Sequence, residues 1–481
     1  MKRIVTLLLA AGLVFGAFGG AHAADIKAKG AFETGFEWND NKNFQNGEHD
    51  GKSEDDFSAA SRLRTQIDVI ASESLSGTVY FEIGGQKWGS KDGALGADGK
   101  VVEVKRSYID WTVPQTDLKV RMGIQGLALP GHDFGSPVLD DDVAALTLSY
   151  AFNDMVGVTA FWARPYDMGG DDVAPIKNAK DEMDLAGLIV PVSLDGVKVT
   201  PWVMYGSIGK DVLNAVQDNR DDLGDIAYNS DSTGHAYQGL STLAMANPAA
   251  VATDSMTAWW GGAAFELTMF DPFKFQADVN YGRTSSDDEA LERNGWLASA
   301  KASYKLGMVT PALYAWYGTG EDDDINNGSE RMPSIAPSWL ASSYGYANSY
   351  GVVASDTILG DNGAGTWAIG IEFGDISFIE NLSHVFRVHY VKGTNDADVI
   401  KDGKIKGTAF DPSSLYTYGG QFLTNEDSAI EVNFDHTYNI YENLALVVEM
   451  GWIKLDLDEE VWADKETDDA WKLNFQFKYS F

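Results

Sequence analysis

The 481-residue sequence contains no cysteine, which excludes disulfides, thiolate metal sites and cysteine nucleophiles together. Proline is scarce, with 13 residues, whereas glycine and the aromatic residues are plentiful. This balance favours strands and turns over helices. Positive charge is also scarce, because 36 Lys and Arg stand against 71 Asp and Glu. We therefore expect no nucleic-acid partner, since phosphate contacts need clustered basic residues.

Long apolar runs are absent except at the N-terminus. Lys2 and Arg3 precede an uncharged run from Ile4 to Gly20, and Ala21-His22-Ala23 has the small-x-small form of a cleavage site. The pattern predicts a secretory signal peptide over residues 1–23, leaving a mature chain of residues 24–481. The alternative is a membrane anchor helix, for which the run is short. Loss of two basic residues makes the formal charge of -35 two units more negative.

The chain is dominated by a two-residue repeat, which is clearest at its C-terminus. There Trp471 and every second residue after it up to Phe481 are apolar, and the intervening residues are polar. The segment 26–38 near the start has the same alternation. A helical period of 3.6 residues fits neither segment, so the pattern indicates half-exposed strands.

Eighteen segments have this character, and the connections between them alternate in length. The segments are 26–38, 59–71, 75–84, 102–113, 118–126, 143–152, 155–165, 182–192, 196–206, 256–268, 273–283, 295–306, 309–318, 364–374, 383–392, 428–438, 443–455 and 470–481. Tight turns such as 72–74 alternate with long acidic stretches such as 207–255 and 319–363. Short turns on one side and long loops on the other predict an all-β fold, a transmembrane antiparallel β-barrel of about 18 strands.

The last strand explains why the chain finishes on an aromatic residue. In a closed barrel this strand pairs with the first, because an open edge in lipid would leave backbone groups without partners. We expect Phe477, Tyr479 and Phe481 to belong to the closing strand, with Phe481 at the membrane interface.

The sequence resembles bacterial outer-membrane porins. The matching features are the signal peptide, an early strand reading AFETGFEW at residues 31–38, and a last strand that ends in Phe481. More narrowly, it looks like the homotrimeric porins of sulfate-reducing bacteria. The resemblance implies 16 or 18 strands, an outer-membrane location in contact with lipid and lipopolysaccharide, and a homotrimer. It also implies that the barrel-assembly machinery reads the closing strand as a signal.

Strand parity predicts a basic wall inside the pore. Five residues fall on inward positions of neighbouring strands: Arg62, Arg64, Arg106, Lys119 and Arg121. The loop that follows, LALPGHDFGSPVLDDDVA, carries Asp133, Asp140, Asp141 and Asp142. By resemblance, this third long loop folds into the barrel and sets its acids against the wall, and we name it the constriction loop. The alternative is that the bases are solvated lumen residues and the acids belong to a surface loop.

These observations favour a porin that forms a water-filled channel for passive diffusion of small hydrophilic solutes and ions. One alternative is a substrate-specific channel for sugars or anions, since Tyr80, Tyr108, Trp202, Trp260, Tyr314 and Trp316 also fall on inward positions. Another is a structural or adhesive barrel with a plugged lumen. No nucleophile or metal-ligand motif stands out, so we expect no enzyme activity, no cofactor and no metal site.

Overall fold

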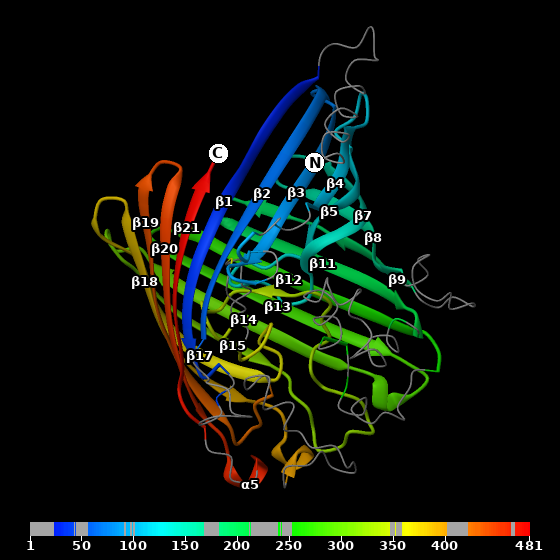
Figure 1. Ribbon diagram of the computed structural model, residues 1–481. Helices are drawn as coiled ribbons and strands as arrows, with labels where there is room; N and C mark the ends of the chain where they lie inside the picture. Colours follow the sequence, from blue (N-terminus) through cyan, green and yellow to red (C-terminus); the bar gives the residue numbers. More distant parts are fainter. Residues whose placement is uncertain are drawn as a thin grey trace.

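The chain forms a closed antiparallel β-barrel, seen in the computed structural model in Figure 1. The structure describes residues 24–42, 44, 56–90, 93–96, 99, 102–167, 182–210, 212, 239–240, 242, 253–346, 352, 358–401, 422–462 and 467–481. The predicted signal peptide, residues 1–23, lies outside the described residues.

The strands of the barrel follow one another around the wall in chain order. They are β1 (Asp25–Asp40), β2 (Asp56–Ser72), β3 (Leu75–Lys87), β4 (Glu103–Thr112), β5 (Lys119–Ala128), β7 (Asp140–Ala151), β8 (Gly157–Asp167), β9 (Glu182–Ile189), β10 (Val192–Leu194), β11 (Val197–Ile208), β12 (Met256–Phe270), β13 (Phe273–Ser285), β14 (Asn294–Tyr304), β15 (Thr310–Gly318), β17 (Thr366–Ile379), β18 (Leu382–Gly393), β19 (Ser428–Tyr441), β20 (Leu444–Asp456) and β21 (Ala470–Ser480).

Among the described residues, β9 and β10 are two parts of one strand, so the barrel has eighteen strands, as predicted. Both parts pair with β11, and the break between them falls at Val190 and Pro191. Pro191 has no amide hydrogen and cannot donate to the ladder, which accounts for the interruption. The barrel closes where β1 pairs with β21, in a register that runs from Ala31–Ser480 to Asp40–Trp471.

The other elements are short. Two small strands, β6 (Gly135–Ser136) and β16 (Ser338–Trp339), pair with each other in a separate sheet. The helical segments include two 3₁₀ turns, η3 (Glu289–Leu291) and η4 (Ala397–Val399), and the single-turn helix α5 (Glu459–Trp462). No helix in the described residues is long and apolar enough to cross a membrane.

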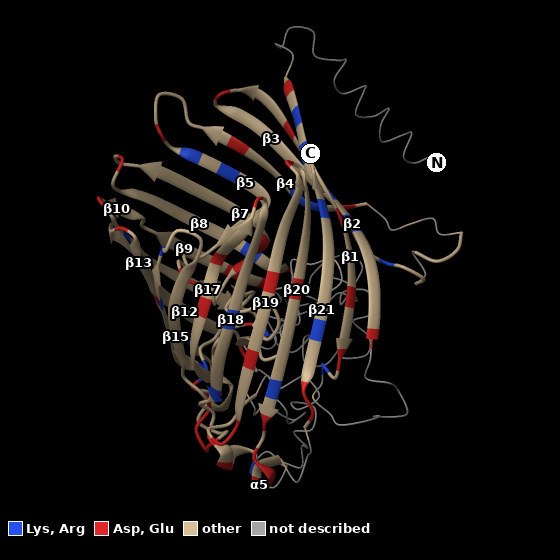
Figure 2. Ribbon diagram, turned by 90° about the vertical axis from the view of Figure 1, so that its left-hand side faces the viewer, with Lys and Arg blue, Asp and Glu red and all other residues tan. Residues whose placement is uncertain are grey.

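The two ends of the barrel differ. At one end, which we call the turn end, adjacent strands are joined by short turns such as 271–272 and 442–443, and the first and last strands begin and finish there. The opposite end, which we call the loop end, carries the longer connections and α5, and acidic residues gather there in Figure 2.

The outer face of the wall is apolar along its middle. On β17 the alternate residues Ile369, Ile371 and Phe373 are exposed, although they are large and hydrophobic. Exposed aromatic residues such as Trp111 and Trp471 lie close to strand ends. An exposed apolar band edged by aromatic residues is the expected surface of a barrel in lipid.

Candidate functional site: the barrel lumen

The four arginines assigned to the basic wall lie on β2, β4 and β5, and none of them is unpaired. Each of its four arginines donates to an acid on another strand: Arg62 to Glu33 at 2.8 Å, Arg64 to Glu82 at 2.5 Å, Arg106 to Asp142 at 2.5 Å and Arg121 to Asp110 at 2.7 Å. Three of these acids stand directly opposite their arginine on the adjacent strand: Glu33 opposite Arg62, Glu82 opposite Arg64 and Asp110 opposite Arg121. The wall therefore consists of ion pairs whose net charge is small.

The fifth basic residue lies apart from these pairs. Lys119 is the first residue of β5, at the turn end, where it stands opposite Thr112 of β4 and Ser149 of β7. Its side chain is exposed. Lys119 therefore belongs to the mouth of the barrel rather than to the row of arginine pairs.

Two arginines of the wall also lie over tyrosine rings. The Arg121 guanidinium is 4.2 Å from the ring centroid of Tyr108, and the Arg106 guanidinium is 5.7 Å from that of Tyr80. Both arginine side chains keep more than a third of their surface exposed. These two Arg–Tyr pairs are planar, cationic surfaces that water in the lumen can reach.

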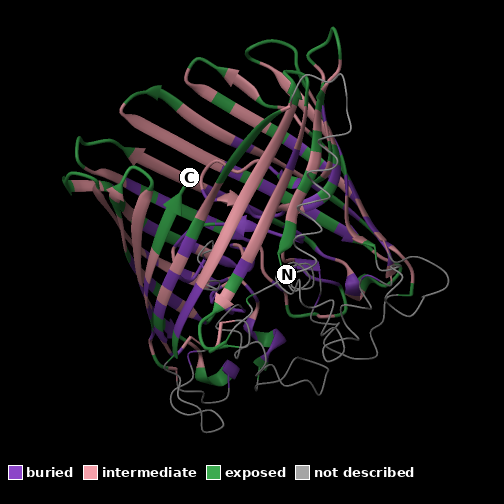
Figure 3. Cartoon of the chain, turned by 45° about the horizontal axis from the view of Figure 1, so that its top comes forward, coloured by how far each residue is buried: buried purple, intermediate pink, exposed green. Residues whose placement is uncertain are grey.

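The constriction loop enters the barrel and packs on the wall opposite the arginines. Phe134 is buried, and its ring lies 5.5 Å from Tyr314 and 6.1 Å from Trp316, both on β15, and 5.2 Å from Trp339 of β16. A second segment, residues 331–346, packs beside it: the β6–β16 pairing and the bond from Leu340 N to Phe134 O join the two. Together these segments fill part of the lumen with an apolar core, and buried segments, coloured purple, lie inside the barrel in Figure 3.

The four acids assigned to the constriction loop occupy two different places. The prediction that Asp140, Asp141 and Asp142 belong to the loop was wrong, because they are the first three residues of strand β7. The strand predicted at 143–152 begins three residues earlier, because its pairing with β5 extends to the Ala128–Asp140 pair. Asp133 does lie in the loop, but its neighbour on the wall is Asp278 of β13 rather than a base.

The inward aromatic residues fall into two groups. Trp202, Trp260, Tyr314 and Trp316 are at most 5% exposed, so the apolar core covers their rings. Tyr80 and Tyr108 are only partly buried. Of the six aromatic residues considered for stacking on a sugar, only these two remain open to the lumen.

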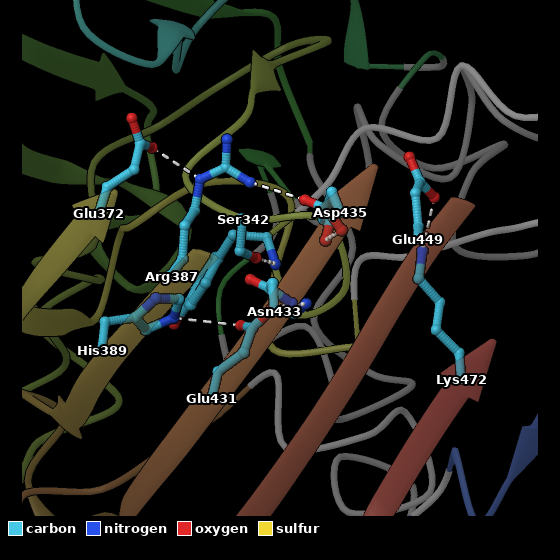
Figure 4. Close-up of polar contacts among 12 residues, drawn as sticks. Ser342, Glu372, Arg387, His389, Glu431, Asn433, Asp435, Glu449 and Lys472 are labelled. Carbon is cyan, nitrogen blue, oxygen red and sulfur yellow. Dashed lines mark hydrogen bonds and ion pairs between the residues drawn. The ribbon is translucent and has the colours of Figure 1, made fainter. Parts of the chain in front are cut away.

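A second charged network lies on β14 to β21 and was not anticipated from the sequence. Glu372 accepts from Lys301 at 2.9 Å. It also accepts from Arg387 at 2.7 Å, and Arg387 donates to Asp435 at 2.8 Å (Figure 4). Farther round the wall, Lys472 lies 3.0 Å from Glu449. Acids and bases are thus mixed in this network as well, although two acids, Asp435 and Glu449, lie on the adjacent strands β19 and β20.

The segment 331–346 is attached to this second network. The Ser343 hydroxyl donates to Asp435 at 2.8 Å, and the Gly345 amide donates to Glu431 at 3.0 Å. Glu431 also contacts His389 at 3.1 Å, and the other ring nitrogen of His389 is 3.0 Å from the Tyr314 hydroxyl. No sequence pattern pointed to this segment, because its anchoring residues are separated from it by 86 and 92 positions.

The closing strand has the expected partners. Tyr479 and Phe481 both lie beside Phe32 of β1, with ring centroids 6.3 and 5.8 Å away. Phe477, Tyr479 and Phe481 are all among the exposed large hydrophobic residues, so they face outward. Within the described residues, no group of three or more His, Cys, Asp and Glu could hold a metal ion.

No protein-family model and no curated protein sequence matches the chain. Solved structures do match it along nearly its whole length. OccK11 (OpdR) of Pseudomonas aeruginosa has a TM-score of 0.51 at 11% identity, covering 96% of this chain and 99% of the other. OpdL of the same organism has a TM-score of 0.51 at 12% identity, covering 95% of this chain and 99% of the other. The outer-membrane protein OprD, also of Pseudomonas aeruginosa, has a TM-score of 0.50 at 11% identity, covering 94% of both chains. The eighteen-stranded barrel of this chain thus has the fold of these outer-membrane porin structures.

Proposed function

We propose that the protein is a porin of the bacterial outer membrane, which lets small hydrophilic solutes and ions diffuse passively through a water-filled lumen. The observation that carries this proposal is the division between the two faces of the wall. Large apolar side chains are exposed on the outside, whereas ionised side chains on the inside, such as Arg121 and Asp110, keep about 39% of their surface accessible. A wall of this kind fits lipid outside and water inside.

The charge pattern of the lumen supports low ion selectivity. Because the wall arginines are paired with acids from other strands, neither sign dominates the field in the pore. The acidic connections at the loop end lie outside the membrane band, where salt at about 0.15 M screens charges beyond about 8 Å. The excess of acids in the sequence therefore contributes little to selectivity.

A substrate-specific channel is the second candidate, and the two Arg–Tyr pairs favour it. Arg106 with Tyr80 and Arg121 with Tyr108 present cations and aromatic faces side by side in the lumen. One of the similar structures is OpdK of Pseudomonas aeruginosa, solved with vanillate, at 9% identity. The burial of four other aromatic residues weakens a stacking path for sugars, which the sequence had left open.

The remaining parts of the proposal concern partners and origin. We propose a homotrimer, contact with outer-membrane lipid and lipopolysaccharide, and insertion by the barrel-assembly machinery through the closing strand. We further propose that residues 1–23 are a signal peptide and that the chain is akin to the porins of sulfate-reducing bacteria. We propose no enzyme activity and no cofactor.

Single-channel recording of the purified protein in planar bilayers tests the proposal. Ohmic steps that close in threes support a trimeric diffusion pore. Saturable block of the current by one class of solute supports the specific channel. The absence of conductance from protein whose mobility on unheated gels shows that it is folded would overturn both, and would favour a barrel plugged by the apolar core.

A further inference from the structure

Strand β13 holds the constriction loop at residues 132 and 133. The backbone amides of His132 and Asp133 both donate to Oδ2 of Asp278, at 2.8 and 3.0 Å. The side-chain amide of Gln276, two residues earlier on the same face, donates to the His132 carbonyl. Three hydrogen bonds between the loop and two wall residues therefore hold the loop where it crosses the lumen.

The same contact brings two carboxyl groups together in a buried place. The carboxyl groups of Asp133 and Asp278 lie within hydrogen-bonding reach of each other, and Asp278 is only 2% exposed. One oxygen of each is satisfied, because Asp133 Oδ1 accepts from Phe134 N at 2.6 Å and Asp278 Oδ2 accepts the two loop amides. The other two oxygens, Asp133 Oδ2 and Asp278 Oδ1, are buried and have no hydrogen-bond partner among the described residues.

Among the residues that the structure describes, no positive group on the surrounding strands compensates the pair. In the ladder, Asp278 stands opposite Ala264 of β12 and Ser299 of β14, which carry no charge. The bases on neighbouring positions are already paired: Lys198 and Lys274 with Glu266, at 2.8 and 2.9 Å, and Lys301 of β14 with Glu372, at 2.9 Å. His132 does not supply a cation either, because burial lowers the pKa of its imidazole below the ordinary value.

Two ionised carboxylates side by side in a buried site would repel each other strongly. A single proton removes the conflict, since one carboxyl then donates its O–H to the free oxygen of the other. That arrangement satisfies both orphaned oxygens and leaves one negative charge, which the loop amides stabilise.

We propose that Asp278 is the positioning residue of the constriction loop and that it holds the loop through one proton shared with Asp133. Loss of this proton at high pH places two charges in the pair, and their repulsion releases residues 131–134 from β13. The pore then widens. This inference rests on the proposed channel function.

The test is the conductance of single channels between about pH 6 and about pH 10, with isosteric variants of the pair. The wild type should gain conductance on the order of twofold at the alkaline end. In Asp278→Asn and in Asp133→Asn an amide N–H donates in place of the proton, so conductance should stay at its neutral value throughout. Asp278→Leu removes the acceptor of the two loop amides, so its conductance should be high at every pH.

Asp68→Asn is the matched control, because Asp68 lies on the inward face of β2 and bonds to Thr78 and Gln66, away from the loop. It should keep the wild-type pH profile. Infrared difference spectra of the folded protein provide a readout that does not depend on conduction. The stretching band of a protonated carboxyl should be present at neutral pH and absent in both Asn variants.

Each result decides one of the two proposals. If neither the wild type nor any variant conducts, the porin proposal fails. The infrared band alone then tests whether Asp133 and Asp278 share a proton. A conducting wild type whose pH profile is flat, or is the same in Asp278→Asn, would overturn the positioning role. A wild type without a protonated-carboxyl band would overturn the shared proton.

Discussion

Gly30 of β1 and Phe481, the last residue of the chain, are joined by two reciprocal backbone hydrogen bonds. Gly30 N donates to Phe481 O at 3.0 Å, and Phe481 N donates to Gly30 O at 3.0 Å. The pair continues the β1–β21 ladder by one residue beyond the Ala31–Ser480 pair. The first and last strands of the barrel therefore meet at this junction, which we call the seam.

Removing Phe481 or replacing it with Asp should sharply reduce the amount of folded barrel. The change strips the aromatic anchor from the closing strand, and in the case of Asp it places a charge at the lipid interface. The measurement is the fraction of protein in the outer membrane that runs as the heat-modifiable form on gels. Phe481→Tyr is the control and should assemble normally. Normal assembly of Phe481→Asp would contradict the anchoring role.

Gly30→Val should destabilise the seam through close packing. A Cβ atom on Gly30 would collide with the Arg64 carbonyl of β2 and approach the Phe481 ring at 2.8 Å. Since the neighbouring strands are fixed by their ladders, we expect loss of stability by about 1–3 kcal/mol. Urea titration of the folded barrel measures this loss. Ala28→Val is the control, because Ala28 lies two residues away on the same face and is exposed. Equal stability of the two variants would rule out the clash.

Replacing Arg62 and Arg64 together with Glu should shift the selectivity of the pore towards cations. Each change leaves an acid, Glu33 or Glu82, beside a second acid, in a lumen where the field is poorly screened. The wild type should be weakly anion-selective or nearly non-selective. The reversal potential in a salt gradient measures the selectivity of the wild type and of the variant. We expect the ratio of cation to anion permeability to change by roughly threefold.

Lys401→Glu is the control for the selectivity experiment. It reverses a charge at the loop end, where the Lys401 side chain is about half exposed and pairs with Asp398. Screening by salt should leave the reversal potential nearly unchanged. A strongly cation-selective wild type that the double substitution does not alter would place control of selectivity in the loops.

Phe134→Ala should loosen the apolar core inside the barrel. The ring fills a buried position between Tyr314, Trp316 and Trp339, and loss of such a ring costs about 3–5 kcal/mol. Because this core holds the constriction loop against β15, we expect a higher and noisier single-channel current. Phe378→Ala serves as the control, because Phe378 is 72% exposed on the outer face. An unchanged current in Phe134→Ala would show that the core does not limit the pore.

The strands of this protein could be predicted from the sequence because their signal is local. A strand in lipid must alternate apolar and polar residues along a short stretch, and segments such as 470–481 show that alternation without reference to any other part of the chain. The inward positions of Arg62, Arg121 and Phe134's neighbour Trp316 follow from the same parity. The weak strand at 182–192 was also identifiable, and Pro191 accounts for its break.

The partners of the charged residues depended on the tertiary structure. Whether Arg106 is an unpaired base of the wall or pairs with Asp142 depends on the folded sheet, because the two lie 36 positions apart, on β4 and β7 with β5 between them. The contacts of the loop residues also depend on the tertiary structure. Asp133 and Asp278 meet although 145 positions separate them, and Ser343 bonds Asp435 although 92 positions separate those two. Alternation fixes which side of the wall a residue faces, whereas closure of the sheet decides what it touches there.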